Sequence, residues 1–138
     1  MKDLVQFSAT EAIYLEQQMV GRLATASKKA CPHVVPVCYA SNSERIFIHT
    51  GRDSKKVRNV IENRKVAFVV DEYLSWEKNR GVIVLGLAGV LEDGEEYDLG
   101  RKLIYGKYPK WEKEYPIIQG EEILLAIIPK KVLSWELE

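Results

Sequence analysis

The sequence has few of the residues that usually carry metal or thiol chemistry. Its 138 residues include two cysteines and two histidines. A structural zinc site usually takes closely spaced cysteine pairs, and Cys31 and Cys38 are too far apart in sequence to form one. No base is obviously paired with either cysteine, and the spacing of residues proposes no Ser-His-Asp arrangement or pair of catalytic carboxylates. We therefore expect no metal site and no catalytic residue of the chain's own, so that any redox chemistry would come from a cofactor.

Net charge and long apolar runs are also missing. Twenty Lys and Arg residues balance twenty Asp and Glu residues, so no overall field attracts nucleic acid or an anionic membrane. The apolar stretch 81–91 contains three glycines and is too short to span a bilayer. The N-terminus lacks the apolar core of a signal peptide. We expect a cytoplasmic protein that binds neither membrane nor nucleic acid.

What the sequence does contain is a series of short strand-like segments with three amphipathic helices between them. Almost half of the residues, 46%, are hydrophobic, which is enough for the core of a single domain over residues 1–138. Helices are expected after the capping-box residue Ser8, at Ser54–Asn63 and at Tyr97–Tyr108. The expected strands are 22–27, 33–40, 45–50, 65–71, 82–92, 121–129 and 132–138. This order favours a mainly β fold, an antiparallel barrel with flanking helices.

The most informative segment runs from His49 and Thr50 through a glycine turn into a basic helix. Ser54, Lys55 and Lys56 form the beginning of this helix, and Val57, Val60 and Ile61 are expected to face the core. The first turn of a helix offers unpaired N–H groups and the positive end of the dipole. A phosphate would fit there, although a basic first turn can also be merely solvent-exposed.

Two further features have a structural and a functional interpretation. Pro36 lies inside a strand, which indicates either an edge strand or backbone turned toward a ligand. Aromatic residues gather in expected loops, among them Tyr108 and Trp111, and could pack in the core, form a subunit interface or cover a flat ring.

The basic segment 52–65 could instead bind nucleic acid, but neutral net charge counts against it.

In this order, the motifs resemble those of the pyridoxamine 5′-phosphate oxidase-like, FMN-binding split-barrel family. The similarity extends over Arg22–Thr25, Pro32–Val37, Ile46–Thr50, Ser54–Lys56, Asn63–Val66 and Val69–Asp71. It implies a six-stranded antiparallel split barrel that forms a homodimer, with FMN in clefts between the subunits. It also implies that the strand His33–Cys38 runs along the flavin ring and that the helix start holds the phosphate. The cofactor-binding residues so implied are His33, Val34, Val35, Pro36, Val37, Cys38, His49, Thr50, Ser54, Lys55, Lys56 and Trp111.

The expected function is that of a flavin-dependent oxidoreductase acting on a small molecule. The oxidases proper carry arginine where His33 stands, so oxidation of pyridoxamine phosphate itself is not expected. Trp111 or Tyr108 of a partner chain would wall the substrate side. The alternatives are a deazaflavin-dependent reductase, whose acidic cofactor tail Arg52 or Arg58 would meet, and a module that binds flavin or haem without turnover.

Overall fold

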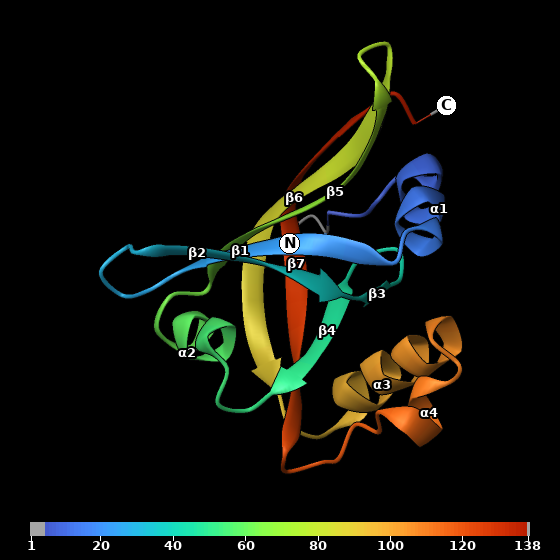
Figure 1. Ribbon diagram of the computed structural model, residues 1–138. Coiled ribbons are helices and arrows are strands. Elements are labelled where there is room, and N and C mark those ends of the chain that lie inside the picture. Colours follow the sequence, from blue (N-terminus) through green and yellow to red (C-terminus); the bar gives the residue numbers. More distant parts are fainter. Residues whose placement is uncertain (1–4, 138) are drawn as a thin grey trace.

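The computed structural model describes residues 5–137, which form one curled antiparallel sheet with helices at its ends (Figure 1). The strands pair in the order β2-β1-β5-β6-β7-β4-β3. They are β1 (Val20–Ala26), β2 (Pro32–Cys38), β3 (Ala40–Ser41), β4 (Ile46–Gly51), β5 (Lys65–Ser75), β6 (Lys78–Leu91) and β7 (Glu122–Trp135). The helices are α1 (Ala9–Gln17), α2 (Lys55–Glu62), α3 (Glu95–Lys107) and the short α4 (Trp111–Glu114). The expected mainly β fold with flanking helices is confirmed.

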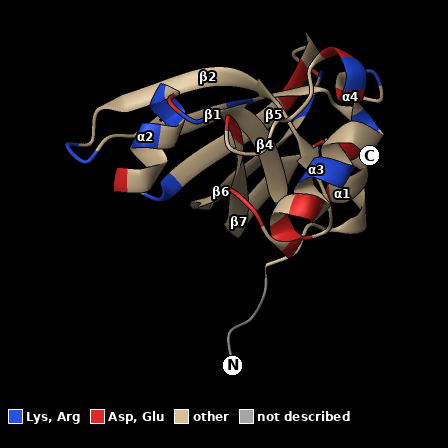
Figure 2. Ribbon diagram, turned by 90° about the horizontal axis from the view of Figure 1, so that it is seen from below, with Lys and Arg blue, Asp and Glu red and all other residues tan. Residues whose placement is uncertain are grey.

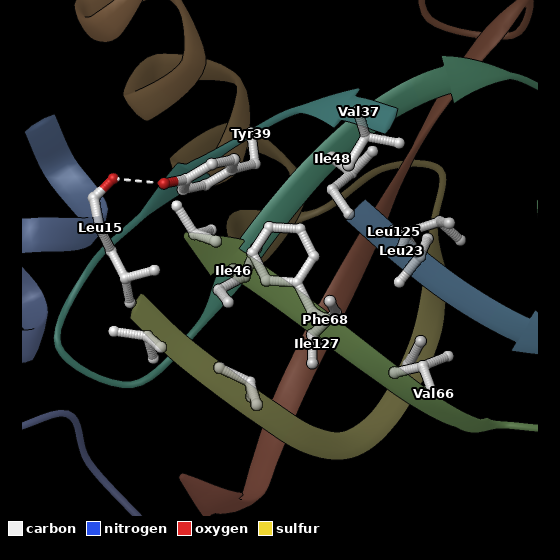
Figure 3. Close-up of a cluster of buried hydrophobic side chains, with 14 of the residues drawn as sticks. Leu15, Leu23, Val37, Tyr39, Ile46, Ile48, Val66, Phe68, Leu125 and Ile127 are labelled. Carbon is white, nitrogen blue, oxygen red and sulfur yellow. Dashed lines mark hydrogen bonds between the residues drawn. The ribbon is translucent and has the colours of Figure 1, made fainter. Parts of the chain in front are cut away.

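The sheet curls around its core without closing, which is what makes the barrel split. Strands β2 and β3 are the two ends of the ladder, and β2 comes close to β4 although the ladder contains no pairing between them (Figure 1). Inside the curl, Leu23, Ile48, Phe68 and Leu125 are almost fully buried, and Tyr39 meets the edge of Phe68 at 5.1 Å (Figure 3). The open seam along β2 therefore lies beside a rigid core.

A second apolar cluster joins the outer face of the sheet to α3. Phe47 of β4 and Leu124 of β7 pack there against Ile104 of α3 and the nearby Tyr108. A Cβ atom at Gly100 of α3 would lie 2.6 Å from a ring carbon of Phe47, so glycine permits the close approach. This contact fixes α3, and with it α4, over one end of the sheet.

Several expectations about the elements were wrong in detail. The sheet has seven strands, whereas the family resemblance implied six. The expected strand 33–40 breaks after Cys38, and the chain resumes as the short β3. The two expected C-terminal strands are one strand, β7, in which the register against β6 shifts by an extra residue between Leu85 and Gly86. The expected loop 72–80 is part of a long hairpin, since β5 continues to Ser75.

Helix predictions were closer. Ser8 forms the expected capping box with Glu11, and α2 lies where the basic helix was expected. Ile61, however, is 68% exposed, because the apolar face of α2 is limited to Val57 and Val60. No helix within residues 5–137 has the length and apolar character needed to cross a membrane. Figure 2 shows basic residues over α2 and acidic residues at the beginning of α3.

Two glycines of α3 provide a matched test of this packing. Gly100→Ala places a methyl group against Phe47 and Leu124, and we expect it to lower the free energy of unfolding by about 1–3 kcal/mol. Gly106→Ala meets nothing within 4 Å and should raise it by about 0.5–1 kcal/mol through helix propensity. Urea denaturation of both variants measures the difference, and equal effects would contradict the close packing of α3.

Candidate functional site

The beginning of α2 lies directly after β4 and leaves its backbone donors free. The Ser54 N–H donates to the Gly51 carbonyl (3.2 Å), and the Ser54 hydroxyl accepts from the Thr50 hydroxyl (3.2 Å). Ser54 is the N-cap residue, yet its side chain does not cap the helix. The N–H groups of the first turn, from Lys55 to Val57, have no intrahelical acceptor. They form a compact set of donors at the positive end of the helix dipole.

The two lysines of this turn have different surroundings. Lys55 is exposed, whereas Lys56 is partly buried, and burial lowers the pKa of its ammonium group. Within residues 5–137 Lys56 forms no ion pair with a carboxylate. A partly desolvated cation without a protein counter-ion favours an anion from outside the chain.

The arginines near the helix start are engaged elsewhere. Arg52 pairs with Glu92 and donates from Nε to the Gly120 carbonyl (3.0 Å). Arg58 donates from Nη1 to the Asp53 carbonyl (3.0 Å), at the turn before the helix. Their contacts hold two loops in place, which leaves the lysines as the available cations of the turn.

His49 lies on the opposite face of β4 from Thr50. Ile48 and Thr50 face the inside of the curl, while His49 faces α4 and the start of β7. Its Nε2 atom is 3.6 Å from Oε2 of Glu122, and its ring meets the ring of Trp111 edge to face, with centroids 5.1 Å apart. Burial lowers the pKa of His49, Glu122 opposes the shift and Lys56 adds to it, so the imidazole is neutral at pH 7.

Strand β2 occupies the edge of the sheet, as Pro36 indicated. Val35 and Val37 face the core, whereas Val34 and Pro36 are exposed on the outer face. Cys38, at the end of the strand, packs against the second cluster together with Trp111. The outer edge of β2 has no partner strand, so backbone groups there are open to a ligand.

His33 adds an unexplained polar atom on the same strand. It pairs in register with Thr25 of β1, and its Nδ1 atom is buried with no hydrogen-bond partner among residues 5–137. A buried imidazole nitrogen without a partner is costly, and a ligand atom is one way to satisfy it.

Three of the aromatic residues noted in the sequence, Tyr108, Trp111 and Tyr115, form one connected group. The Trp111 ring stacks on Tyr108 at 4.2 Å and 16°, and Tyr115 meets Trp111 edge to face at 6.3 Å. Tyr108 is itself buried: its hydroxyl donates to the Met19 carbonyl (2.7 Å) and accepts from the Tyr39 N–H (3.1 Å). Within its own chain, the ring of Tyr108 therefore belongs to the second apolar cluster and supports Trp111.

Two groups of predicted residues therefore lie near one another around the end of β4. Residues Thr50 to Lys56 form the basic turn at the start of α2, and His49 and Trp111 line a neighbouring pocket of about 500 Å³. Sequence reasoning missed Glu122, Pro116 and Ile118 of this pocket. Only the contacts of His49 across the sheet could have identified Glu122, and those require the register between β4 and β7.

The fold is that of a split-barrel protein, with an aromatic pocket beside the basic start of α2. Residues 9–136 match the family described as pyridoxamine 5′-phosphate oxidase. The chain therefore belongs to the pyridoxamine 5′-phosphate oxidase family.

One relative is similar to this chain in sequence, and two solved structures are similar to it in fold. The chain is 35% identical over 138 residues to the 5a,11a-dehydrotetracycline/5a,11a-dehydrooxytetracycline reductase of Streptomyces rimosus, covering 96% of this chain and 84% of the reductase. A FAD-binding protein from Mesorhizobium loti is 25% identical with a TM-score of 0.72, covering 94% and 93% of the two chains. An F420 reductase has the same TM-score, 0.72, at 21% identity, covering 92% and 98%.

The environment of His49 predicts that the free energy of unfolding depends on pH. Because the folded state lowers its pKa below the usual value of about 6.5, the unfolded chain binds the proton first as the pH falls. The free energy of unfolding should therefore decrease as the pH falls through about 6.5 toward the lower folded pKa. Urea denaturation between pH 8 and pH 5 should show a shallower decrease in His49→Gln than in the natural protein. An unchanged slope would contradict the assigned burial.

Proposed function

We propose that the protein is a flavin-dependent oxidoreductase that binds FMN with its phosphate at the beginning of α2. The observation that carries the proposal is Lys56, a partly buried ammonium group without a protein counter-ion beside free backbone donors. The hydroxyl pair of Thr50 and Ser54 adds donors at the same point. These groups suit a phosphate dianion, which needs several donors and positive charge in one place.

The flavin ring would lie along the open edge of β2. Its outer backbone groups, from Val35 to Cys38, can hydrogen-bond the heteroatom edge of a planar ring, and the exposed Val34 and Pro36 offer apolar surface. When bound, the flavin supplies the capacity to accept and return hydride. The chain supplies the position of the ring along β2.

A reductive reaction is favoured by the relative from Streptomyces rimosus, which is named as a reductase of dehydrotetracyclines. That relative shares almost the whole length of this chain. We infer that the substrate here is also a small organic molecule with a reducible bond.

The outer face of the sheet supports a homodimer as the active form. The strand registers place Val34, Ala24, Ala67 and Leu85 in one row across four strands. A neighbouring row ends in Ile83 and Leu133. Exposed fractions of 64% for Val34, 39% for Leu85 and 45% for Leu133 leave an apolar band, interrupted by Arg22 and bordered by Lys131, that a second copy would cover.

A deazaflavin is the second candidate cofactor, because an F420 reductase shares this fold and such a cofactor also carries a phosphate. The absorption spectrum of the purified protein separates flavin, deazaflavin and haem. A bound haem, or an absence of turnover with any reductant, would favour a binding module instead.

The phosphate assignment predicts the effect of removing the two lysines. Lys55→Ala combined with Lys56→Ala should weaken FMN binding by about 10- to 100-fold, because two charge-assisted contacts are lost. Lys56→Ala alone should account for most of the loss, since its ammonium group is the less solvated of the two. Isothermal titration of the apoprotein with FMN measures the affinity.

The adjacent lysines of the β1–β2 turn provide the control. Lys28→Ala with Lys29→Ala removes the same charge from another exposed turn and should leave FMN affinity within about twofold. Equal losses in both double variants would show a general charge effect and would refute the phosphate site.

The dimer proposal is tested at two leucines of similar exposure. Leu85 lies in the apolar band and is 39% exposed, while Leu99 lies on α3 and is 43% exposed. Leu85→Lys should yield a monomer by light scattering, because burying a lysine in an apolar interface is strongly unfavourable. Leu99→Lys should remain a dimer. A monomeric natural protein, or a dimeric Leu85→Lys, would exclude this interface.

A further inference from the structure

The pocket beside His49 has the shape and lining of a binding site for an organic ring. Its volume is about 500 Å³, within the usual range for small-molecule sites. Trp111, Tyr115, Pro116 and Ile118 supply aromatic and aliphatic surface. Such surface binds flat apolar groups by stacking and burial.

The main wall of the pocket is fixed before any ligand arrives. Trp111 stacks on Tyr108, and the Tyr108 hydroxyl is tied to Met19 and Tyr39. Burial raises the pKa of Tyr108, so this hydroxyl keeps its proton and its hydrogen bonds. A wall held in this way costs little further entropy when a ring binds.

Charge in the pocket selects against an acidic ligand. Glu122 is the one carboxylate among the lining residues, and no lysine or arginine lines the pocket with it. His49 is neutral at pH 7 and lies 3.6 Å from this carboxylate. The lining residues therefore offer an acceptor and no cation, with Lys56 outside the lining as the cation that acts on His49, which suits a neutral ring bearing an N–H or O–H group.

Position connects the pocket to both ends of the proposed flavin site. His49 faces the opposite side of β4 from Thr50, but the ammonium group of Lys56, from the proposed phosphate cradle, is close enough to help lower the pKa of His49. On the other side, Trp111 packs in the same cluster as Cys38, the last residue of β2. A ligand in the pocket would lie near the proposed phosphate end of the cofactor. It would also lie near the end of β2, the strand along which the flavin ring is proposed to bind.

We propose that this pocket binds a flat, uncharged ring system that donates a hydrogen bond to Glu122. The proposal rests on the proposed function for the identity of the neighbouring cofactor. Two sources could supply such a ring: the substrate to be reduced, or the base of a flavin dinucleotide extending beyond the phosphate.

The experiment measures binding to the full chain by isothermal titration, with 2-naphthol and 2-naphthoate as neutral and acidic probes of the same ring. We expect 2-naphthoate to bind about tenfold more weakly than 2-naphthol, because its carboxylate would face Glu122. In Glu122→Gln this difference should shrink to less than about threefold. Trp111→Ala and Tyr115→Ala should each weaken 2-naphthol about tenfold, while Trp76→Ala, at an 81% exposed side chain of the β5–β6 hairpin, should change nothing.

Titrations with FMN and FAD then distinguish the two sources. FAD binding about tenfold tighter than FMN, with the advantage lost in Tyr115→Ala, would identify a nucleotide base. Equal affinities, with 2-naphthol still binding to the FMN-loaded protein, would identify the substrate.

The proposal is overturned if 2-naphthol does not bind, if its affinity is the same in Tyr115→Ala, or if both probes bind equally. Tyr115 is 63% exposed, so its variant remains informative even where Trp111→Ala disturbs the fold. Failure of FMN to bind, with the probe results unchanged, would refute the flavin assignment and leave the ring pocket standing.

Discussion

The hydroxyl of Tyr108 is the contact on which the arrangement of the site depends. It donates to the carbonyl of Met19, before β1, and accepts from the N–H of Tyr39, between β2 and β3. Tyr39 belongs to the core inside the curl, with its own hydroxyl bonded to the Leu15 carbonyl (Figure 3). Tyr108 belongs to the cluster under α3. One phenol therefore joins two hydrophobic cores that lie on opposite faces of the sheet.

The same residue determines where Trp111 lies, and Trp111 determines the shape of the pocket beside His49. Lys107 strengthens this corner, since its ammonium group donates to the Leu15 carbonyl (3.1 Å) and lies 3.8 Å from the centre of the Tyr39 ring. Burial lowers the pKa of Lys107 to about 8. The pocket and the turn at the start of α2 are both attached to β4, so their relative position is fixed by one strand.

Local patterns in the sequence were sufficient for the features that depend on neighbouring residues. The capping box at Ser8, the basic start of α2 and the edge position of the Pro36 strand each follow from spacing within a few residues. The exposure of Ile61 and the single long strand β7 depend on what lies opposite in three dimensions, and spacing could not reveal them. The pairing of His49 with Glu122 is of the same kind. It joins residues far apart in sequence that meet only because β4 pairs with β7. His49 faces α4 because successive side chains of a strand point to opposite faces of the sheet.

The open edge of β2 has one further consequence. An unpaired strand beside an apolar face normally invites a stray strand from another molecule, which is how many sheets begin to aggregate. Pro32 and Pro36 interrupt the row of amide donors that such a strand would need. The carbonyl groups and the other amides of the edge remain usable by a small planar molecule. The two prolines thus allow the edge of β2 to stay unpaired while making it a poor template for a further strand.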